Sequence, residues 1–262
     1  MLVALTLVTG CNTSSGLSGL TIEKEQGTVQ NISSLTQVVE RNPNDPEAYN
    51  VRGSAYGRAG LYSQALQDFS KAISLNNRYY QAYANRALMY KNTGDFKSAI
   101  NDYNQALSIN PNYTEAYIGR GEVYDRANQP QSALRDYNRA IQLGTNNPRA
   151  YHRRGIILQR NRDHAAAIED FSKALAIEDK RAEPYNGRGL SYLATGALDN
   201  AFDDFNTALK LDPDYAEAWT NQALVYEQRG QMQRAFKSYS RAASLKPSYT
   251  PAKDGMRRTR GG

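Results

Sequence analysis

Few side chains in this sequence have the type and spacing that catalysis requires. The two histidines, His152 and His164, lie twelve residues apart without a cysteine or an obvious second ligand, so they predict neither a metal site nor an acid–base pair. Gly-Arg-Gly begins at Gly119 and at Gly187, but no strand precedes either and no Gly-Lys-Ser/Thr phosphate loop occurs. We therefore predict no catalytic residue, no metal site and no cofactor.

The single cysteine, Cys11, has surroundings that predict a covalent modification. Val-Thr-Gly-Cys matches the bacterial lipobox, in which small residues precede a cysteine whose thiol is diacylated, and residues 2–8 form an apolar run. No positive charge precedes that run, so either the true start lies upstream or the segment does not direct export. We expect a lipoprotein-type signal peptide at 1–10, and the lipidated Cys11 with a flexible tether at 11–28. Asn12, rather than Asp, favours the outer membrane facing the periplasm.

The elements that carry any functional residue follow from an internal repeat. From Pro46 to Tyr249 the chain divides into six repeats of 34 residues without insertion or deletion. Repeat position 4 is a large aromatic residue, position 8 is Gly or Ala, and position 11 is Tyr or Leu, so all three share one helical face. A second helix carries alanine, an aromatic residue four positions later, and alanine three positions beyond that. Small residues allow the helices to approach and aromatic side chains fill the space between them.

Two charged positions recur together, and we interpret them as ion pairs. Position 7 is arginine and position 23 is aspartate in the first five repeats, whereas the sixth repeat has Gln222 and Ser238. The planar guanidinium group can donate two hydrogen bonds to one carboxylate, so we expect each arginine to bind an aspartate of the same repeat or of the next one. The alternative is that the arginines form a row of positive charges, a ladder that binds anionic ligands. The residues are Arg52, Arg86, Arg120, Arg154 and Arg188 with Asp68, Asp102, Asp136, Asp170 and Asp204.

The whole pattern resembles the tetratricopeptide repeat (TPR), over residues 46–249 of the 262. The resemblance implies an all-α, right-handed superhelical solenoid of antiparallel helix pairs. Its repeats would be 46–79, 80–113, 114–147, 148–181, 182–215 and 216–249. We expect capping helices to flank them: one at 29–45 that packs through Leu35 and Val38, and a polar cap with a basic tail at 250–262.

By the same resemblance, the first helices line a concave groove, and positions 2, 5, 9, 12 and 13 point into it. The groove is mixed in charge and carries an apolar stripe, which suggests a partner helix or extended segment. A self-packed or solvated groove is the alternative. The residues we expect to contact a partner are Leu88, Lys91, Ile118, Glu122, Arg126, His152, Ile156, Arg160, Asn186, Leu190, Leu193 and Leu224.

The charge and hydropathy of the sequence limit the classes of partner that we expect. The net charge is +6, but the tyrosines at positions 4 and 11 are committed to packing, so we do not expect nucleic-acid binding. No run of 18 apolar residues occurs. We expect a non-enzymatic adaptor that binds other proteins, as a membrane-anchored TPR lipoprotein of the bacterial cell envelope. The alternatives are a cytosolic TPR peptide-binding protein with a mis-assigned start and no lipid, and a hidden enzyme activity.

Overall fold

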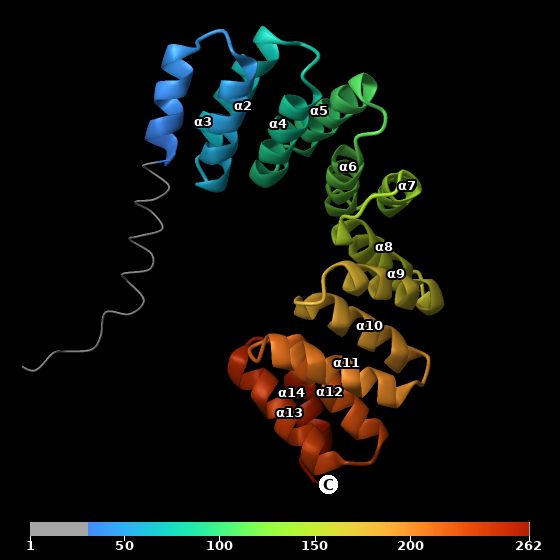
Figure 1. Cartoon of the computed structure of the whole chain (residues 1–262). Coiled ribbons are helices and arrows are strands. Elements are labelled where there is room, and N and C mark those ends of the chain that lie inside the picture. The colour runs from blue at the N-terminus through green and yellow to red at the C-terminus, as the bar shows by residue number, and fades with distance from the viewer. Residues whose placement is uncertain (1–30, 262) are drawn as a thin grey trace, which may run out of the picture. The chain divides into compact units, whose positions relative to one another are not determined.

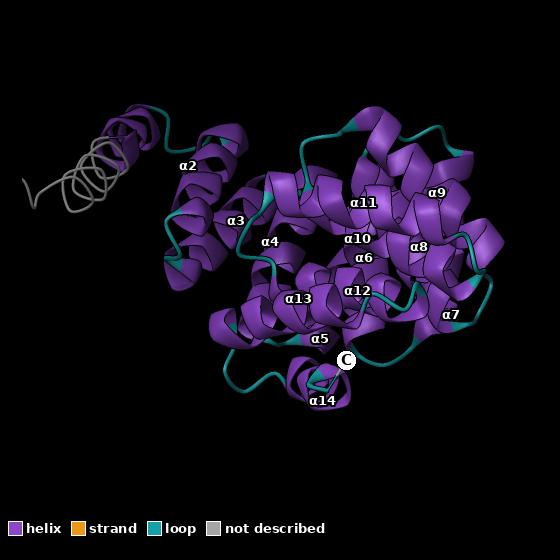
Figure 2. Ribbon diagram, turned by 90° about the horizontal axis from the view of Figure 1, so that it is seen from below, coloured by secondary structure: helices purple, strands orange, loops and turns teal. Residues whose placement is uncertain are grey.

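The computed structural model of the chain describes residues 31–261. In that range the regular structure is α-helical throughout (Figure 2). After a helical segment at 31–41, the helices are α2 (Pro46–Arg58), α3 (Tyr62–Leu75), α4 (Tyr80–Thr93), α5 (Phe96–Ile109), α6 (Thr114–Arg126), α7 (Pro130–Gln142), α8 (Pro148–Arg160), α9 (His164–Ile177), α10 (Ala182–Ala194), α11 (Leu198–Leu211), α12 (Ala216–Gln228), α13 (Met232–Leu245) and α14 (Thr250–Thr259). The predicted signal peptide, Cys11 and the tether lie outside the described residues.

The helices keep the 34-residue period of the sequence, and local signals mark where many of them begin and end. Asp45 and Asn147 cap the first helices α2 and α8 with their side chains, and proline follows each cap. The turn between the two helices of a repeat needs one left-handed residue, which glycine adopts most easily; Gly94 has φ +86°. Arg162 takes the same conformation, with φ +64°, where the fourth repeat lacks glycine.

Two compact units make up the chain, and each is a series of antiparallel helix pairs (Figure 1). The N-terminal unit ends at Ile109 and contains α2–α5; the C-terminal unit begins at Asn110 and contains α6–α14. Within each unit, a second helix packs on its own first helix and on the first helix of the next repeat. Neighbouring first helices also touch, as α2 touches α4 and α10 touches α12. The predicted fold of serial TPR helix pairs is confirmed within each unit.

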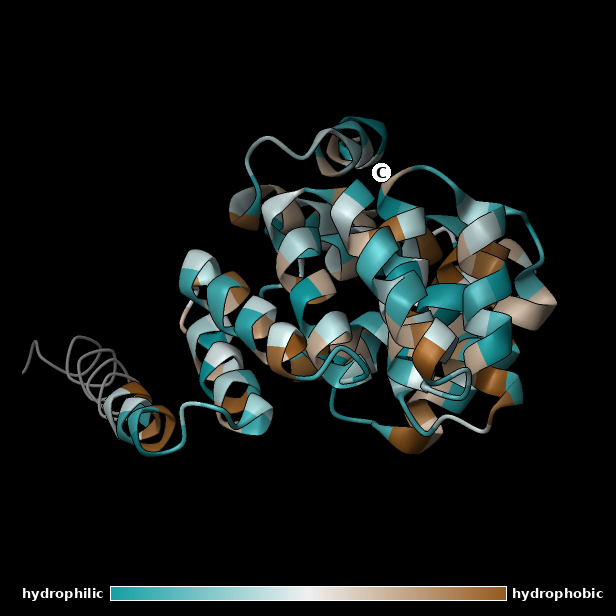
Figure 3. Ribbon diagram, turned by 90° about the horizontal axis from the view of Figure 1, so that it is seen from above, coloured by the Kyte–Doolittle hydropathy of each residue, from teal (hydrophilic) through white to brown (hydrophobic). Residues whose placement is uncertain are grey.

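Alternating small and aromatic residues form the core. The alanine that precedes the aromatic residue on each second helix is fully buried, as are Phe171, Phe205 and Tyr239. Where position 8 is glycine, it leaves space for the ring of its own repeat: a Cβ would lie 2.9 Å from Cε1 of Phe69 if it were added to Gly53, and 2.7 Å from Cε1 of Phe205 if it were added to Gly189. Figure 3 shows hydrophobic and hydrophilic residues alternating along the helices, as amphipathic packing requires.

The two ends of the repeat array carry the expected helices, with one correction. In the segment 31–41, Val39 is buried and Val38 is 43% exposed, so the prediction that the cap packs through Val38 is wrong. At the other end α14 packs on α13 and α12 and buries Ala252, Gly255 and Thr259. In the described range, no helix has the length and apolar character that a membrane span requires.

Candidate protein-binding site on the first helices

The recurrent arginine and aspartate bind each other within one repeat. In all five pairs the arginine Nε and one terminal nitrogen donate to the two carboxylate oxygens, at 2.6–2.8 Å. The pairs are Arg52–Asp68, Arg86–Asp102, Arg120–Asp136, Arg154–Asp170 and Arg188–Asp204. Positions 7 and 23 face each other across the antiparallel pair, which settles the two partners that the sequence left open.

Aromatic rings and burial complete this arrangement. The guanidinium of Arg188 lies 5.7 Å from the ring centre of Tyr185 and 5.9 Å from that of Tyr192. The hydrogen bonds to Asp204 raise the pKa of Arg188, against the opposing effect of burial. In the sixth repeat a neutral set replaces the pair, because Ser238 donates to Gln222 at 2.8 Å. The arginines are therefore bound to aspartates and leave no ladder for anionic ligands.

Four of the residues expected in the groove are buried. Ile118 is 1% exposed and belongs to a cluster with Ala150 and Ile157 of the next first helix, so the prediction that it contacts a partner is wrong. Asn186 is 7% exposed, and Lys91 and Glu122 are also buried, so the same correction applies to them. Position 5 faces the neighbouring first helix rather than solvent.

Charged residues of the groove in the C-terminal unit pair with each other. Glu122 accepts hydrogen bonds from Arg149, and Asp125 accepts one from Arg160. These bonds connect α6 to α8, and Arg126 is exposed beside them. The hollow at this point is only about 30 Å³. The cluster therefore connects helices and offers little space to a ligand.

His152 is held neutral by its surroundings. Burial, with the positive charges of Arg153 and Arg181, lowers its pKa to about 4. Its ring lies 5.8 Å from the ring centre of Phe171. No group of three potential metal ligands occurs among residues 31–261. His152 is thus a packed aromatic residue at neutral pH.

The other apolar groove residues are half-buried, and four of them pack against clusters of the core. Ile156 is half-buried on α8. Leu190 and Leu193 of α10 pack against the Phe205 cluster, and Leu224 of α12 packs against the Tyr239 cluster. Leu88 of α4, in the N-terminal unit, packs against Phe69 and Met89. Each keeps one side toward solvent.

The N-terminal unit has an open pocket between α2 and α4, which we call the α2–α4 pocket. Its volume is about 260 Å³. It is lined by Ser54, Gly57, Arg58, Phe69, Asn85, Leu88, Met89 and Asn92. A Cβ on Gly57 would lie 2.9 Å from Sδ of Met89, so the glycine keeps the floor open.

Hydrogen bonds orient the amide in the α2–α4 pocket. Asn85 donates through Nδ2 to Oδ1 of Asn50 at 2.9 Å, and Asn50 donates in turn to the hydroxyl of Tyr79 at 3.1 Å. No hydrogen bond within the described residues uses Oδ1 of Asn85, which remains an acceptor. Because Arg58 and Asn92 are exposed at the rim, the pocket combines an apolar floor with amide and guanidinium groups. This set fits an extended peptide with one apolar side chain.

The same amide chain recurs four repeats later. Asn221 donates to Asn186 at 2.8 Å and Asn186 donates to Tyr215 at 3.3 Å. In the fifth repeat, position 12 is Leu193, whereas in the first repeat it is Gly57. Sequence reasoning found Leu88 but missed Asn85, Phe69 and Met89 as pocket residues. The recurrence of asparagine at position 6, in Asn85 and Asn221, was the available signal.

Comparisons with known proteins agree with this architecture. Family models of the tetratricopeptide repeat match residues 46–79, 80–113, 148–181 and 216–249, and a TPR repeat model matches 189–230. A search of curated protein sequences gives no match.

Three solved structures show the same fold. The chain is similar to the Cut9–Hcn1 hetero-tetramer of APC/C, with 22% identity over 86% of this chain and 44% of that chain, and a TM-score of 0.74. It is also similar to PilF of Pseudomonas aeruginosa, with 16% identity over 81% of this chain and 97% of that one, and a TM-score of 0.75. The third is YrrB, described as a TPR protein with an unusual peptide-binding site, with 23% identity over 72% and 97% and a TM-score of 0.63. Because TPR models match most of the 34-residue repeats and each repeat folds as an antiparallel helix pair, the chain belongs to the tetratricopeptide repeat family.

Proposed function

We propose that this chain is a non-enzymatic adaptor that binds an extended segment of another protein in the α2–α4 pocket. The observation that carries the proposal is the pocket itself, where an amide acceptor on Asn85 lies beside an apolar floor made by Phe69, Leu88 and Met89. A peptide backbone N–H would donate to Asn85, and an apolar side chain would enter the floor. Arg58 at the rim favours an acidic residue next to that side chain.

The likeness to YrrB supports this proposal. That protein is described by its unusual peptide-binding site, and TPR proteins bind other proteins or peptides. The half-buried Leu190, Leu193 and Leu224 of the C-terminal unit are a second candidate contact region of the same kind, because each keeps a solvent-facing side.

Photo-crosslinking tests the pocket. A benzophenone amino acid replaces the exposed Asn92 in the full chain, and adducts formed in cells are identified by mass spectrometry. We expect one discrete adduct, which Leu88→Glu abolishes because it places a charge on the apolar floor. Leu61→Glu is the matched control, since Leu61 is an exposed leucine of the same unit outside the pocket. An adduct that survives Leu88→Glu, or no adduct at all, would contradict the proposal.

We further propose that Cys11 is lipidated and anchors the chain to the bacterial cell envelope, at the outer membrane. The lipobox-like Val-Thr-Gly-Cys and the apolar run before it support this. A lipid chain contributes about 0.8 kcal/mol per buried methylene, so several chains hold a protein durably on a membrane. Radiolabelled palmitate should enter the wild type and not Cys11→Ser. Equal labelling of both would refute an anchor at Cys11, and a chain found entirely in the soluble fraction would favour the cytosolic peptide-binding alternative.

A further inference from the structure

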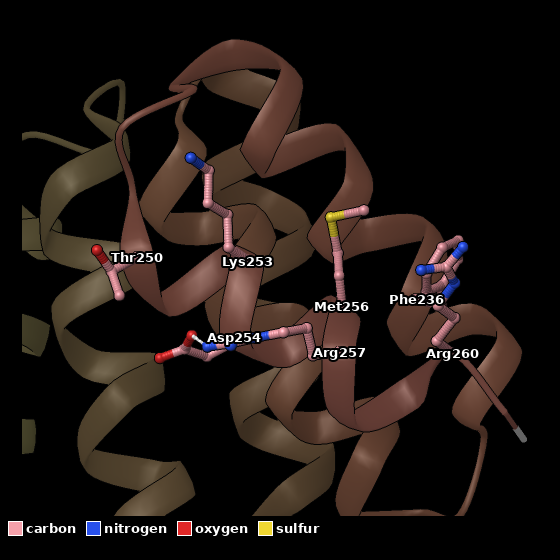
Figure 4. Close-up of a pocket in the computed structure, with 7 residues that line it drawn as sticks. All are labelled: Phe236, Thr250, Lys253, Asp254, Met256, Arg257 and Arg260. Carbon is pink, nitrogen blue, oxygen red and sulfur yellow. Dashed lines mark hydrogen bonds and ion pairs between the residues drawn. The ribbon is translucent and has the colours of Figure 1, made fainter.

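We propose that the last helix carries a second docking surface, which receives an acidic amphipathic helix of a partner protein. The surface is a hollow of about 630 Å³ on α13 and α14, which we call the α14 hollow (Figure 4). It is lined by Phe236, Thr250, Lys253, Asp254, Met256, Arg257 and Arg260. None of these residues belongs to the α2–α4 pocket, so this proposal is independent of the peptide site.

The hollow lies beside Phe236, whose aromatic cover differs from that of its equivalent one repeat earlier. Helix α14 has 10 residues, whereas α12 has 13. One repeat earlier, the ring of Phe202 is covered on two sides: the ring of Tyr226 lies 5.3 Å away, edge-on, and the guanidinium of Arg229 lies 4.7 Å away. Phe236 is the equivalent of Phe202, but the equivalent of Tyr226 is Arg260, which follows the last residue of α14. Phe236 therefore lacks that aromatic cover and lines the hollow.

The floor of the hollow is apolar and its rim is positive. Met256 packs against the Tyr239 cluster and, with Phe236, supplies the floor. Arg257 pairs with Asp254, whereas Lys253 and Arg260 form no ion pair within residues 31–261. Figure 4 shows Lys253 and Met256 projecting from α14, and Arg260 just after it beside Phe236 of α13. Two unpaired cations thus border an apolar floor.

The first helices of the other repeats show what packs against the surface that α14 leaves exposed. In the fifth repeat, the residues equivalent to Lys253 and Arg257 face the second helix of that repeat: Tyr185 packs with Ala208, and Gly189 faces Phe205. Arginine at position 7 binds an aspartate on the same second helix. In α14 position 7 is Met256, and cations hold positions 4 and 8. A complementary helix would place apolar residues over Met256 and Phe236 and acidic residues near Lys253 and Arg260. A second copy that offered the same face would oppose cations with cations, so we assign the hollow to an acidic partner helix.

The chain itself supplies matched probes for this proposal. The α11 sequence, LDNAFDDFNTALKL, has three aspartates and one lysine, whereas the α13 sequence, MQRAFKSYSRAASL, has two arginines, one lysine and no acidic residue. Both are 14-residue second helices with the same Ala-Phe spacing. Fluorescent peptides of each sequence, stapled to hold the helix, are titrated with the full chain and followed by anisotropy.

We expect the α11 peptide to bind at least tenfold more tightly than the α13 peptide. The variant Lys253→Glu with Arg260→Glu should reverse that order, and Lys253→Gln with Arg260→Gln should remove the preference. The control, Lys173→Glu with Lys210→Glu, changes the net charge equally on exposed residues elsewhere in the C-terminal unit and should bind like the wild type. Because all of these side chains are exposed, the melting temperature should not change.

Three outcomes would overturn the proposal. They are equal binding of the two peptides, α11 binding that the Lys253 and Arg260 substitutions leave unchanged, and a dimer by light scattering that the same substitutions dissociate. The last result would assign the hollow to a second copy. A benzophenone at Met256 of the full chain checks the location, because the adduct with the α11 peptide must form there.

Discussion

The arginine at position 7 holds the two helices of a repeat together through fixed, directional contacts. Its guanidinium group donates hydrogen bonds to both oxygens of one carboxylate. In the first, third and fifth repeats two tyrosine rings flank the guanidinium. Both charges are largely withdrawn from solvent; the Arg154 side chain is 23% exposed and that of Asp170 is 4% exposed. Removing one partner leaves the other charge buried without a counter-charge, which lowers the free energy of unfolding.

The sixth repeat shows a neutral set of residues that can replace the ion pair, and it suggests a variant that measures the free-energy cost of an unpaired charge. Gln222 donates to Asn206 at 2.7 Å and accepts from Ser238, and Arg154 likewise donates to Asn138 at 2.7 Å. We expect Arg154→Ala to lower the free energy of unfolding by about 3 kcal/mol. Arg154→Gln with Asp170→Ser copies the neutral set and should lose less than half of that. Urea denaturation measures both. A double substitution as damaging as Arg154→Ala would contradict the role of an uncompensated Asp170.

The neutral, buried His152 makes stability depend on pH. An unfolded histidine titrates near pH 6.5, whereas burial and two arginines lower the pKa of His152 to about 4. The unfolded chain therefore binds the proton first, so the stability from this group is present above about pH 6.5 and is lost as the pH falls toward 4. We expect a loss of about 3 kcal/mol over that range. Denaturation curves at several pH values should show that His152→Gln removes this slope and that His164→Gln keeps it; an unchanged slope in His152→Gln would refute the account.

At the scale of the helix, the period of the sequence was sufficient to predict every pair in the array. Left-handed turns such as that at Gly94, and the alanine and aromatic positions, are local and recur every 34 residues. The start signal at Asp45–Pro46 recurs in the fourth repeat, at Asn147–Pro148. The prediction failed where burial depends on the neighbouring repeat. Ile118 is covered by residues of α8, and nothing within its own repeat reveals that.

The α2–α4 pocket shows the same limit. Its opening depends on Gly57 meeting Met89 of the next repeat, and its amide acceptor depends on Asn85 reaching Asn50 of the previous one. Each residue is visible in the sequence, but the contact exists only between repeats. Positions 5, 6 and 12 therefore need the geometry of two adjacent first helices before their role can be assigned.

Docking of α14 depends on Gly255. A Cβ at that residue would lie 2.4 Å from Cε1 of Tyr239, a ring that is fully buried and cannot move aside easily. We expect Gly255→Ala to cost about 1–3 kcal/mol and to loosen α14 from α13. Gly261→Ala, where no atom lies within 4 Å of the added Cβ, should be neutral. Amide hydrogen exchange across α13 and α14 measures this, and equal protection in the two variants would show that the helix tolerates the contact.

At the scale of the molecule, each unit is a stack in which a repeat contacts only its neighbours, so each contributes its own surfaces. The N-terminal unit offers the α2–α4 pocket and the C-terminal unit offers the α14 hollow. A lipid on Cys11, joined by the tether that we expect at 11–28, would hold both surfaces at a membrane. In the adaptor function that we propose, the two surfaces would bring partners together.

Hydrogen exchange of the full chain, with and without the peptide segment identified by crosslinking, tests the binding role most directly. We predict that the segment slows exchange in α2 and α4, which line the pocket, and leaves α6–α14 unchanged, and that Leu88→Glu removes the protection. Protection confined to residues 110–261, or none at saturating segment, would contradict the claim that this protein works by holding a partner between its first helices.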